Sequence, residues 1–151
     1  MSFQKSLSTV SALAIAAILS APGAALAVNV QVTFENLNTS QSAMYSPVSN
    51  GEVFTYANAN PKPEDIVLSG QSDSYTVGNP ITNLATSAHV RYKIGSKQCI
   101  FHTTYTSMPS GGALIPNWTK SYEASGGASC TATITYVDAS NYNWKVKFTM
   151  K

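Results

Sequence analysis

The chain has 151 residues, of which 44% are apolar, 10% aromatic and 11% charged. This length suits one domain with one core, and the low charged fraction argues against a long solvated helix or a coiled coil. Nine basic and seven acidic residues give a net charge of +2, far below the excess that nucleic-acid binding requires. The composition therefore excludes nucleic acid as an expected partner and favours strands and turns.

Residues 1–27 have the layout of a secretory signal peptide. Lys5 precedes an apolar stretch over 10–19, a Pro-Gly break follows, and Ala-Leu-Ala at 25–27 forms a cleavage site. A transmembrane anchor is the alternative, but the apolar run is far shorter than the roughly 20 residues that a bilayer requires. We expect cleavage to leave residues 28–151 as a single β-sandwich domain. The Ala-rich leader is typical of bacteria, so the predicted location is secreted or periplasmic.

Both ends of the remaining chain have the pattern of a strand. Apolar and polar side chains alternate over 28–35 and again over 144–151, which indicates strands with one buried face. The last segment turns its lysines to water, and lysines on a strand discourage edge-to-edge aggregation.

Further strands are predicted between these ends. The stronger ones cover 89–94, 99–105 and 130–137, and the weaker ones cover 53–56, 66–68, 75–77 and 118–123. Turn residues such as Asn50-Gly51 and Gly111-Gly112 separate them. No segment after the leader has helical periodicity with caps. Eight or nine short strands predict an all-β, antiparallel β-sandwich, with a flattened β-barrel as the alternative.

The two cysteines share the parity of inward-facing residues on their strands. Cys99 has the parity of Phe101, and Cys130 has that of Ile134. In an oxidising compartment this arrangement predicts a structural disulfide between Cys99 and Cys130. The bridge closes a loop of about 32 residues and contributes about 3–4 kcal/mol in the loop-entropy description. A redox pair or metal site is the alternative, but the chain has no C-x-x-C motif.

The chain has two histidines, His89 and His102, and both lie on predicted strands. A hairpin between these strands would bring the two imidazoles to one face, but two neutral ligands without a third bind zinc weakly. The sequence contains no G-x-S-x-G elbow, and its acidic residues fall in turns or on solvent faces. We therefore predict no catalytic residues, no metal and no cofactor.

Residues 106–117 form the most unusual segment, an expected loop that carries Met108, Leu114 and Ile115 around a glycine pair and is followed by Trp118. One interpretation is that these apolar side chains fold back and plug one end of the sandwich. The other is that they form an exposed tip that meets a partner or a membrane interface.

A second candidate surface is aromatic. Tyr136, Tyr142 and Trp144 flank the turn at 138–141, with Asn143 between two of the rings. Aromatic faces beside amide groups are typical of sugar-binding sites. The parity of Trp144 predicts that it is buried, which leaves Tyr142 as the expected exposed ring.

We expect a non-enzymatic exported binding module that recognises a protein, glycan or cell-surface partner through loops at one end of a β-sandwich. The size, the exported sandwich pattern and the many aromatic residues also resemble the aegerolysins, small membrane-binding partners of pore-forming toxins, although their Trp-rich, Cys-Pro motif has no counterpart here. This resemblance implies the alternative of a membrane-active protein or toxin component that inserts an apolar loop into a lipid membrane. A small secreted hydrolase that depends on His102 is the second alternative.

Overall fold

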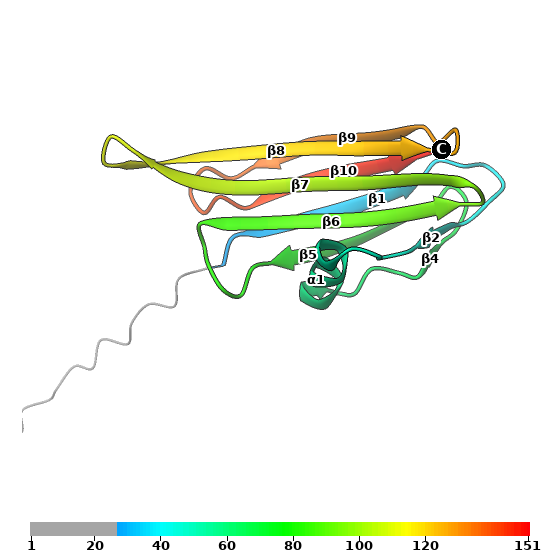
Figure 1. Ribbon diagram of the computed structural model, residues 1–151, viewed down its shortest axis with the longest axis horizontal. Coiled ribbons are helices and arrows are strands. Elements are labelled where there is room, and N and C mark those ends of the chain that lie inside the picture. Colours follow the sequence, from blue (N-terminus) through cyan, green and yellow to red (C-terminus); the bar gives the residue numbers. More distant parts are fainter. Residues whose placement is uncertain (1–26) are drawn as a thin grey trace, which may run out of the picture.

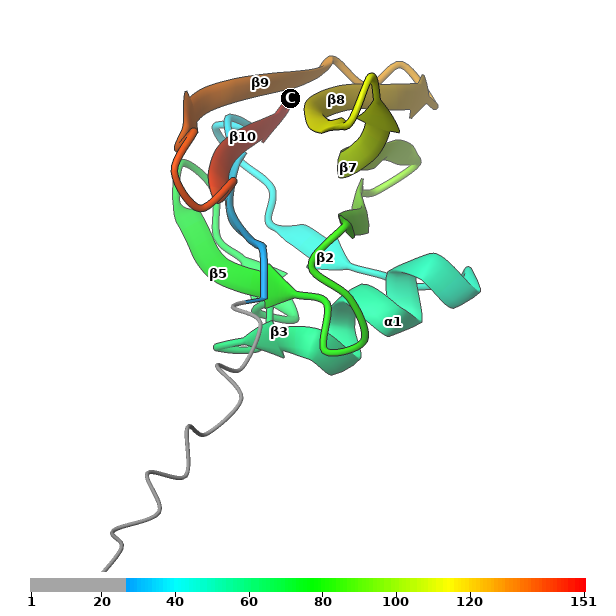
Figure 2. The ribbon, with the colours of Figure 1, turned by 90° about the vertical axis from the view of Figure 1, so that its left-hand side faces the viewer.

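The computed structural model describes residues 27–151, which form two five-stranded sheets packed face to face (Figures 1 and 2). The first sheet has the order β3 (Ala59–Asn60), β5 (Ser72–Gly78), β1 (Asn29–Asn36), β10 (Trp144–Met150) and β9 (Cys130–Val137). The second has the order β4 (Ile66–Val67), β2 (Ala43–Tyr45), β6 (Ala85–Ile94), β7 (Lys97–Ser110) and β8 (Ala113–Ser125). The predicted signal peptide, apart from Ala27, lies outside the described residues.

The predicted antiparallel sandwich is confirmed, and the sheets do not close into the alternative barrel. One pairing departs from the all-antiparallel expectation, because β1 and β10 run parallel with Val30 opposite Trp144. These two strands are the first and last of the described chain. No tight turn joins them, so nothing in their connection requires the antiparallel direction.

The core comes from the inward-facing residues of both sheets. The ring of Phe34 on β1 stacks on that of Tyr92 on β6 with 3.5 Å between centroids, and Phe101 stacks on Phe148 at 4.6 Å. Trp144 is 1% exposed, as its parity predicted, and its indole N–H donates to the Thr103 hydroxyl over 3.0 Å. Strand alternation thus accounts for the packing between the sheets.

The predicted strand at 53–56 is wrong, because these residues lie in the helix α1 (Asn50–Asn58). Ser49 caps the helix by accepting a hydrogen bond from the Glu52 amide, and the Glu52 side chain accepts one from the Ser49 amide. This Ser-x-x-Glu capping box outweighs the strand preference of the Val-Phe-Thr-Tyr run. The helix packs on β6, where Gly51 lies against the ring of His89.

The predicted disulfide is confirmed. Cys99 on β7 and Cys130 on β9 are bonded, with 5.9 Å between their Cα atoms, so the bridge joins the two sheets. Along the same side of the sandwich the Lys120 ammonium on β8 donates to the Ala132 carbonyl on β9 over 2.7 Å. Among residues 27–151, no helix has the length and apolar character needed to cross a bilayer.

Candidate functional site

The segment expected to be a loop at 106–117 is instead the end of a long β-hairpin. The ladder between β7 and β8 continues through the pairs Met108 with Ile115 and Pro109 with Leu114. Only Gly111 and Gly112 form the turn, with φ of 59° and 83° that suit residues without a Cβ. The expectation of a loop failed because the two prolines occupy strand positions of the hairpin.

This hairpin extends beyond the other strands at one end of the sandwich (Figure 1). Met108, Leu114 and Ile115 are 62%, 49% and 53% exposed, which supports the exposed-tip interpretation over the folded-back one. No acidic or basic residue occurs between His102 and Lys120. We call Met108, Leu114 and Ile115 the apolar tip.

The loop between β5 and β6 adds two more exposed apolar side chains at the same end. Ile81 is 82% exposed and Leu84 is 46% exposed. The loop is ordered by its own hydrogen bonds, since the Asn79 side chain accepts from the Ile81 amide and donates to the Ala85 carbonyl. Together with the apolar tip, they place five exposed apolar side chains at this end of the sandwich.

A cavity of about 380 Å³ lies at the base of the hairpin. Leu84 and Leu114 form part of its wall, and Val28, the residue just before β1, contributes as well. The inward face of β7 supplies Tyr105 and Ser107, and the loop between β9 and β10 supplies residues 140–142. Four segments that are distant in the sequence therefore meet here.

Two hydroxyl groups in the wall of this cavity lack a partner. Tyr105 is fully buried and Ser107 is 9% exposed, yet neither side-chain oxygen has a hydrogen-bond partner among the described residues. Leaving a buried hydroxyl unpaired costs about 1–3 kcal/mol. Both oxygens are also almost completely covered, so they lie within the wall of the cavity and are not open to it.

An aromatic cluster supports the wall. Tyr105 stacks on Tyr142 with 5.5 Å between centroids and lies 5.4 Å from Trp118. The Trp118 indole N–H donates to the Tyr142 carbonyl over 3.2 Å. This contact holds Tyr142 in a left-handed conformation, with φ of 63°, that is unusual for a residue with a side chain. Tyr142, expected to be exposed, is partly buried.

Asn143, the remaining predicted binding residue, faces away from this cavity. Its side-chain oxygen accepts from the Asn29 amide over 2.7 Å. It lines a second cavity, of about 350 Å³, together with Tyr136 and Lys145. The structure thus brings Leu114 and Tyr142 together in the first cavity and places Trp118 behind it. Met108 and Ile115 lie across from each other at the tip.

Sequence reasoning missed Tyr105 and Ser107 as site residues. Their parity on β7 gives inward orientation, which alone predicts core burial. The length of the hairpin is the signal that these residues line a cavity. Strands β7 and β8 have 14 and 13 residues, whereas β9 and β10 in the facing sheet have 8 and 7. The end of the hairpin therefore faces loops in place of a strand.

His89 and His102 share the outer face of the second sheet, as the predicted hairpin required, with 3.6 Å between ring centroids. Burial lowers the pKa of both imidazoles; nearby Glu52 opposes this for His89, and His89 adds to it for His102. The Nε2 atom of His102 lies 2.8 Å from the Thr104 hydroxyl. Within the described residues, no group of three or more His, Cys, Asp or Glu side chains could hold a metal ion.

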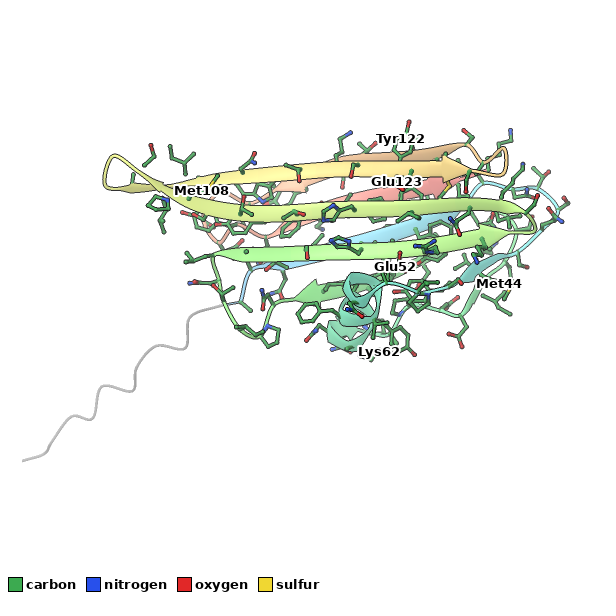
Figure 3. The ribbon with its side chains drawn as sticks, viewed as in Figure 1. Met44, Glu52, Lys62, Met108, Tyr122 and Glu123 are labelled. Carbon is green, nitrogen blue, oxygen red and sulfur yellow. A yellow bond between two sulfur atoms is a disulfide. The ribbon has the colours of Figure 1, made fainter. Side chains whose placement is uncertain are left out.

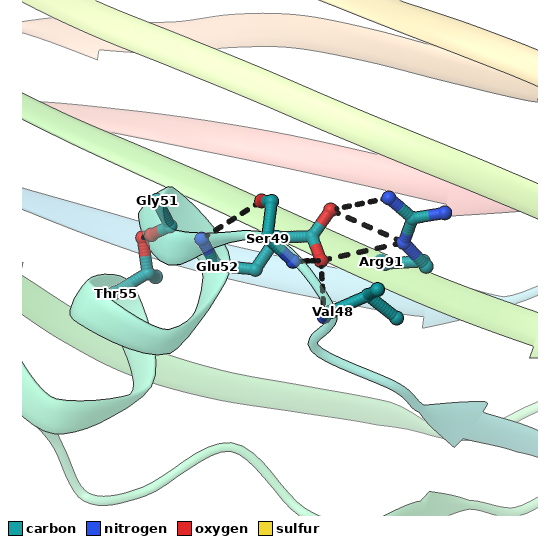
Figure 4. Close-up of polar contacts among 6 residues, drawn as sticks. All are labelled: Val48, Ser49, Gly51, Glu52, Thr55 and Arg91. Carbon is teal, nitrogen blue, oxygen red and sulfur yellow. Dashed lines mark hydrogen bonds and ion pairs between the residues drawn. The ribbon is translucent and has the colours of Figure 1, made fainter.

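The Glu52 side chain links α1 to the outer face of the second sheet, through Arg91 on β6 (Figure 4). Its carboxylate accepts two hydrogen bonds from backbone amides, those of Val48 and Ser49, and others from the Arg91 guanidinium, the shortest 2.9 Å. Burial raises the pKa of Glu52, but these bonds outweigh it and hold the pKa below its usual value. The Glu52 and Arg91 side chains are 2% and 17% exposed. Both are engaged with each other, so this cluster is structural.

No family model matches the chain, and no curated protein or solved structure matches it either.

Proposed function

We propose that this protein is a non-catalytic exported binding module that meets its partner with the end of the sandwich that carries the apolar tip. The supporting observation is the combination found there, an uncharged projecting hairpin with exposed apolar side chains beside a cavity with unpaired hydroxyls. Elsewhere on the outer face, Glu52 forms an ion pair with Arg91, and the rings of His89 and His102 pack against each other. A rigid scaffold with its contact residues at one end is the common design of binding sandwiches.

The test compares two pairs of exposed apolar residues at opposite ends. Met108 and Ile115 are a cross-strand pair at the tip, and Met44 and Ile66 are a cross-strand pair near the other end (Figure 3). Their exposures are similar, at 62% and 53% for the first pair and 58% and 53% for the second. The M44D/I66D variant is therefore a matched control for M108D/I115D.

Binding of the purified protein would be measured on an array of immobilised glycans and on vesicles of phosphatidylcholine with phosphatidylglycerol. The proposal expects a bound surface on which M108D/I115D loses most of the signal and M44D/I66D keeps it. Equal loss in both variants, or no binding to either probe, would contradict it.

Membrane insertion by the tip is a second candidate, favoured by the lack of charge near Met108, Leu114 and Ile115. Fully burying one such side chain contributes about 1.5–3 kcal/mol, so three give measurable affinity for a bilayer interface. Co-sedimentation of the wild type with the vesicles, lost in M108D/I115D, would select this candidate. Binding to glycans without co-sedimentation would reject it.

A further inference from the structure

The second cavity, which Tyr136, Asn143 and Lys145 help to line, lies on the outer face of the first sheet. Gln31 on β1 and Thr76 on β5 also line it. Gln31 lies opposite Thr76 on one side and opposite Lys145 on the other. Tyr136 continues the row as the partner of Lys145 on β9. Four neighbouring strands therefore place one outward-facing side chain each in a row across the sheet.

The polar groups of this row are open to solvent. Gln31, Tyr136 and Lys145 are exposed, and none of their side chains forms a hydrogen bond or an ion pair with another described residue. The Lys145 ammonium lies above the ring of Tyr136, 5.8 Å from its centroid. A ligand can therefore reach these groups without moving the protein or displacing an internal hydrogen bond.

Lys145 is the single charged side chain among the residues that line this cavity. Lys147 lies two positions further along the same face of β10 and pairs with Glu35 over 3.0 Å, whereas Lys145 has no acidic partner among residues 27–151. An anionic group above Lys145 would gain a counter-charge, and a cation would be repelled. The cavity therefore favours a ligand that carries one negative charge at this position.

A third cavity, of about 460 Å³, adjoins the second, because Asn29 and Thr76 line both. Its lining has no charged side chain and is rich in amides, with Asn58 at the end of α1 and Asn60 on β3. Both volumes lie within the range of small-molecule sites, about 300–1,000 Å³. A molecule that spans the two cavities meets one ammonium at one end and uncharged hydrogen-bonding groups at the other.

The row of side chains favours a saccharide over a peptide. Strands β5, β1 and β10 each have a neighbour on both sides, so their backbone groups are used within the sheet and an extended peptide would find no backbone partners there. The ring of Tyr136, 51% exposed, offers an apolar surface to C–H groups, and Gln31 and Thr76 offer an amide and a hydroxyl to sugar hydroxyls. A saccharide with a carboxylate matches all of these groups.

We propose that the second and third cavities together bind an acidic oligosaccharide in which a carboxylated sugar neighbours a neutral one. The carboxylate lies at Lys145, and the neutral sugar lies against the amides of Asn58 and Asn60. This site goes beyond the proposed function and does not rest on it, because Met108 and Ile115 line neither cavity.

Amide NMR spectra of the protein would be recorded with a tetrasaccharide of alternating glucuronic acid and N-acetylglucosamine at millimolar concentration. The sugar is expected to shift the signals of Gln31, Thr76 and Lys145, and high salt should weaken its binding. K145Q should weaken it about threefold to tenfold, the effect of one exposed charge-assisted hydrogen bond. K147Q makes the same change on the same face of the same strand, so it is the matched control and should bind as the wild type does.

Two further sugars test the pattern of charge. A tetrasaccharide of N-acetylglucosamine has no charge, and one of galacturonic acid has a charge on every ring, so both should bind more weakly than the alternating sugar. Because Lys145 is exposed, K145Q should melt as the wild type does, and its weaker binding then reports a contact with the ligand.

Four outcomes would overturn the assignment. They are no shift with the alternating tetrasaccharide, equal binding of the uncharged one, the same shifts with acetate alone, and equal losses in K145Q and K147Q. M108D/I115D should keep this binding, and its loss in that variant would also overturn the assignment. The proposed function is tested separately, by the surface that M108D/I115D ceases to bind and K145Q still binds.

Discussion

Replacing Glu52 with glutamine should destabilise the protein strongly, although the substitution is nearly isosteric. Both carboxylate oxygens of Glu52 face donors only, namely the Arg91 guanidinium and the amides of Val48 and Ser49. The glutamine amide nitrogen would point a donor at one of these donors. It would also leave Arg91, whose side chain is 17% exposed, without its counter-charge.

The expected cost follows from this geometry. Removing one partner of a buried ion pair costs about 3–5 kcal/mol, and the partial exposure of Arg91 places E52Q at the lower end, about 3 kcal/mol. For a domain of this size, that corresponds to a fall in melting temperature of roughly 10–15 °C. The loss concerns the junction of α1 with β6, so the disulfide-linked side of the sandwich is unaffected.

Thermal and urea unfolding followed by circular dichroism would measure the effect. E123Q, which changes the same group on the exposed outer face of β8, is the control and should stay within about 0.5 kcal/mol of the wild type. R91Q combined with E52Q should cost clearly less than the sum of the single changes, because both remove one interaction. A shift in E52Q no larger than that in E123Q would refute the reasoning.

Two further predictions concern the disulfide and pH. Replacing both cysteines, in C99A/C130A, should lower the free energy of unfolding by about 3–4 kcal/mol, since the bridge joins residues 31 positions apart; a urea midpoint equal to that of the wild type would contradict this. The pKa values of His89 and His102 are lowered in the folded protein, so the unfolded chain binds protons more readily than the folded one. The stability present above the usual histidine pKa of 6.5 should therefore fall as the pH decreases through the folded pKa values. The lowered pKa of Glu52 adds a second loss of stability below its usual pKa of 4.5. Urea midpoints that stay constant as the pH falls, together with an H89Q/H102Q variant that behaves as the wild type does, would contradict the predicted losses from the histidines and from Glu52.

Strand alternation was sufficient to predict much of the fold, because burial between two sheets depends on local parity. It gave the exact bounds of β9, the inward orientation of Cys99 and Cys130, and the burial of Trp144. It failed at α1, where the residues at 53–56 prefer strands. The local Ser49-x-x-Glu52 capping box favours the helix, and the contact of Glu52 with Arg91, 39 positions away, holds the helix against β6 without any local signal in the sequence.

The candidate site was less predictable because it depends on a difference in length between facing strands. Parity places Tyr105 and Ser107 inward, but whether an inward residue meets a core or a cavity depends on what lies opposite. Here β7 and β8 are nearly twice as long as β9 and β10, so the hairpin overhangs the first sheet. Its inner face then meets the loops at 79–84 and 138–143, each of which contains an Asx turn. The carbonyls of Leu84 and Tyr142 in these loops accept hydrogen bonds from the Ser107 amide and the Trp118 indole of the hairpin. No loop atom pairs with the hydroxyls of Tyr105 and Ser107, so these two buried groups stay without a partner among the described residues.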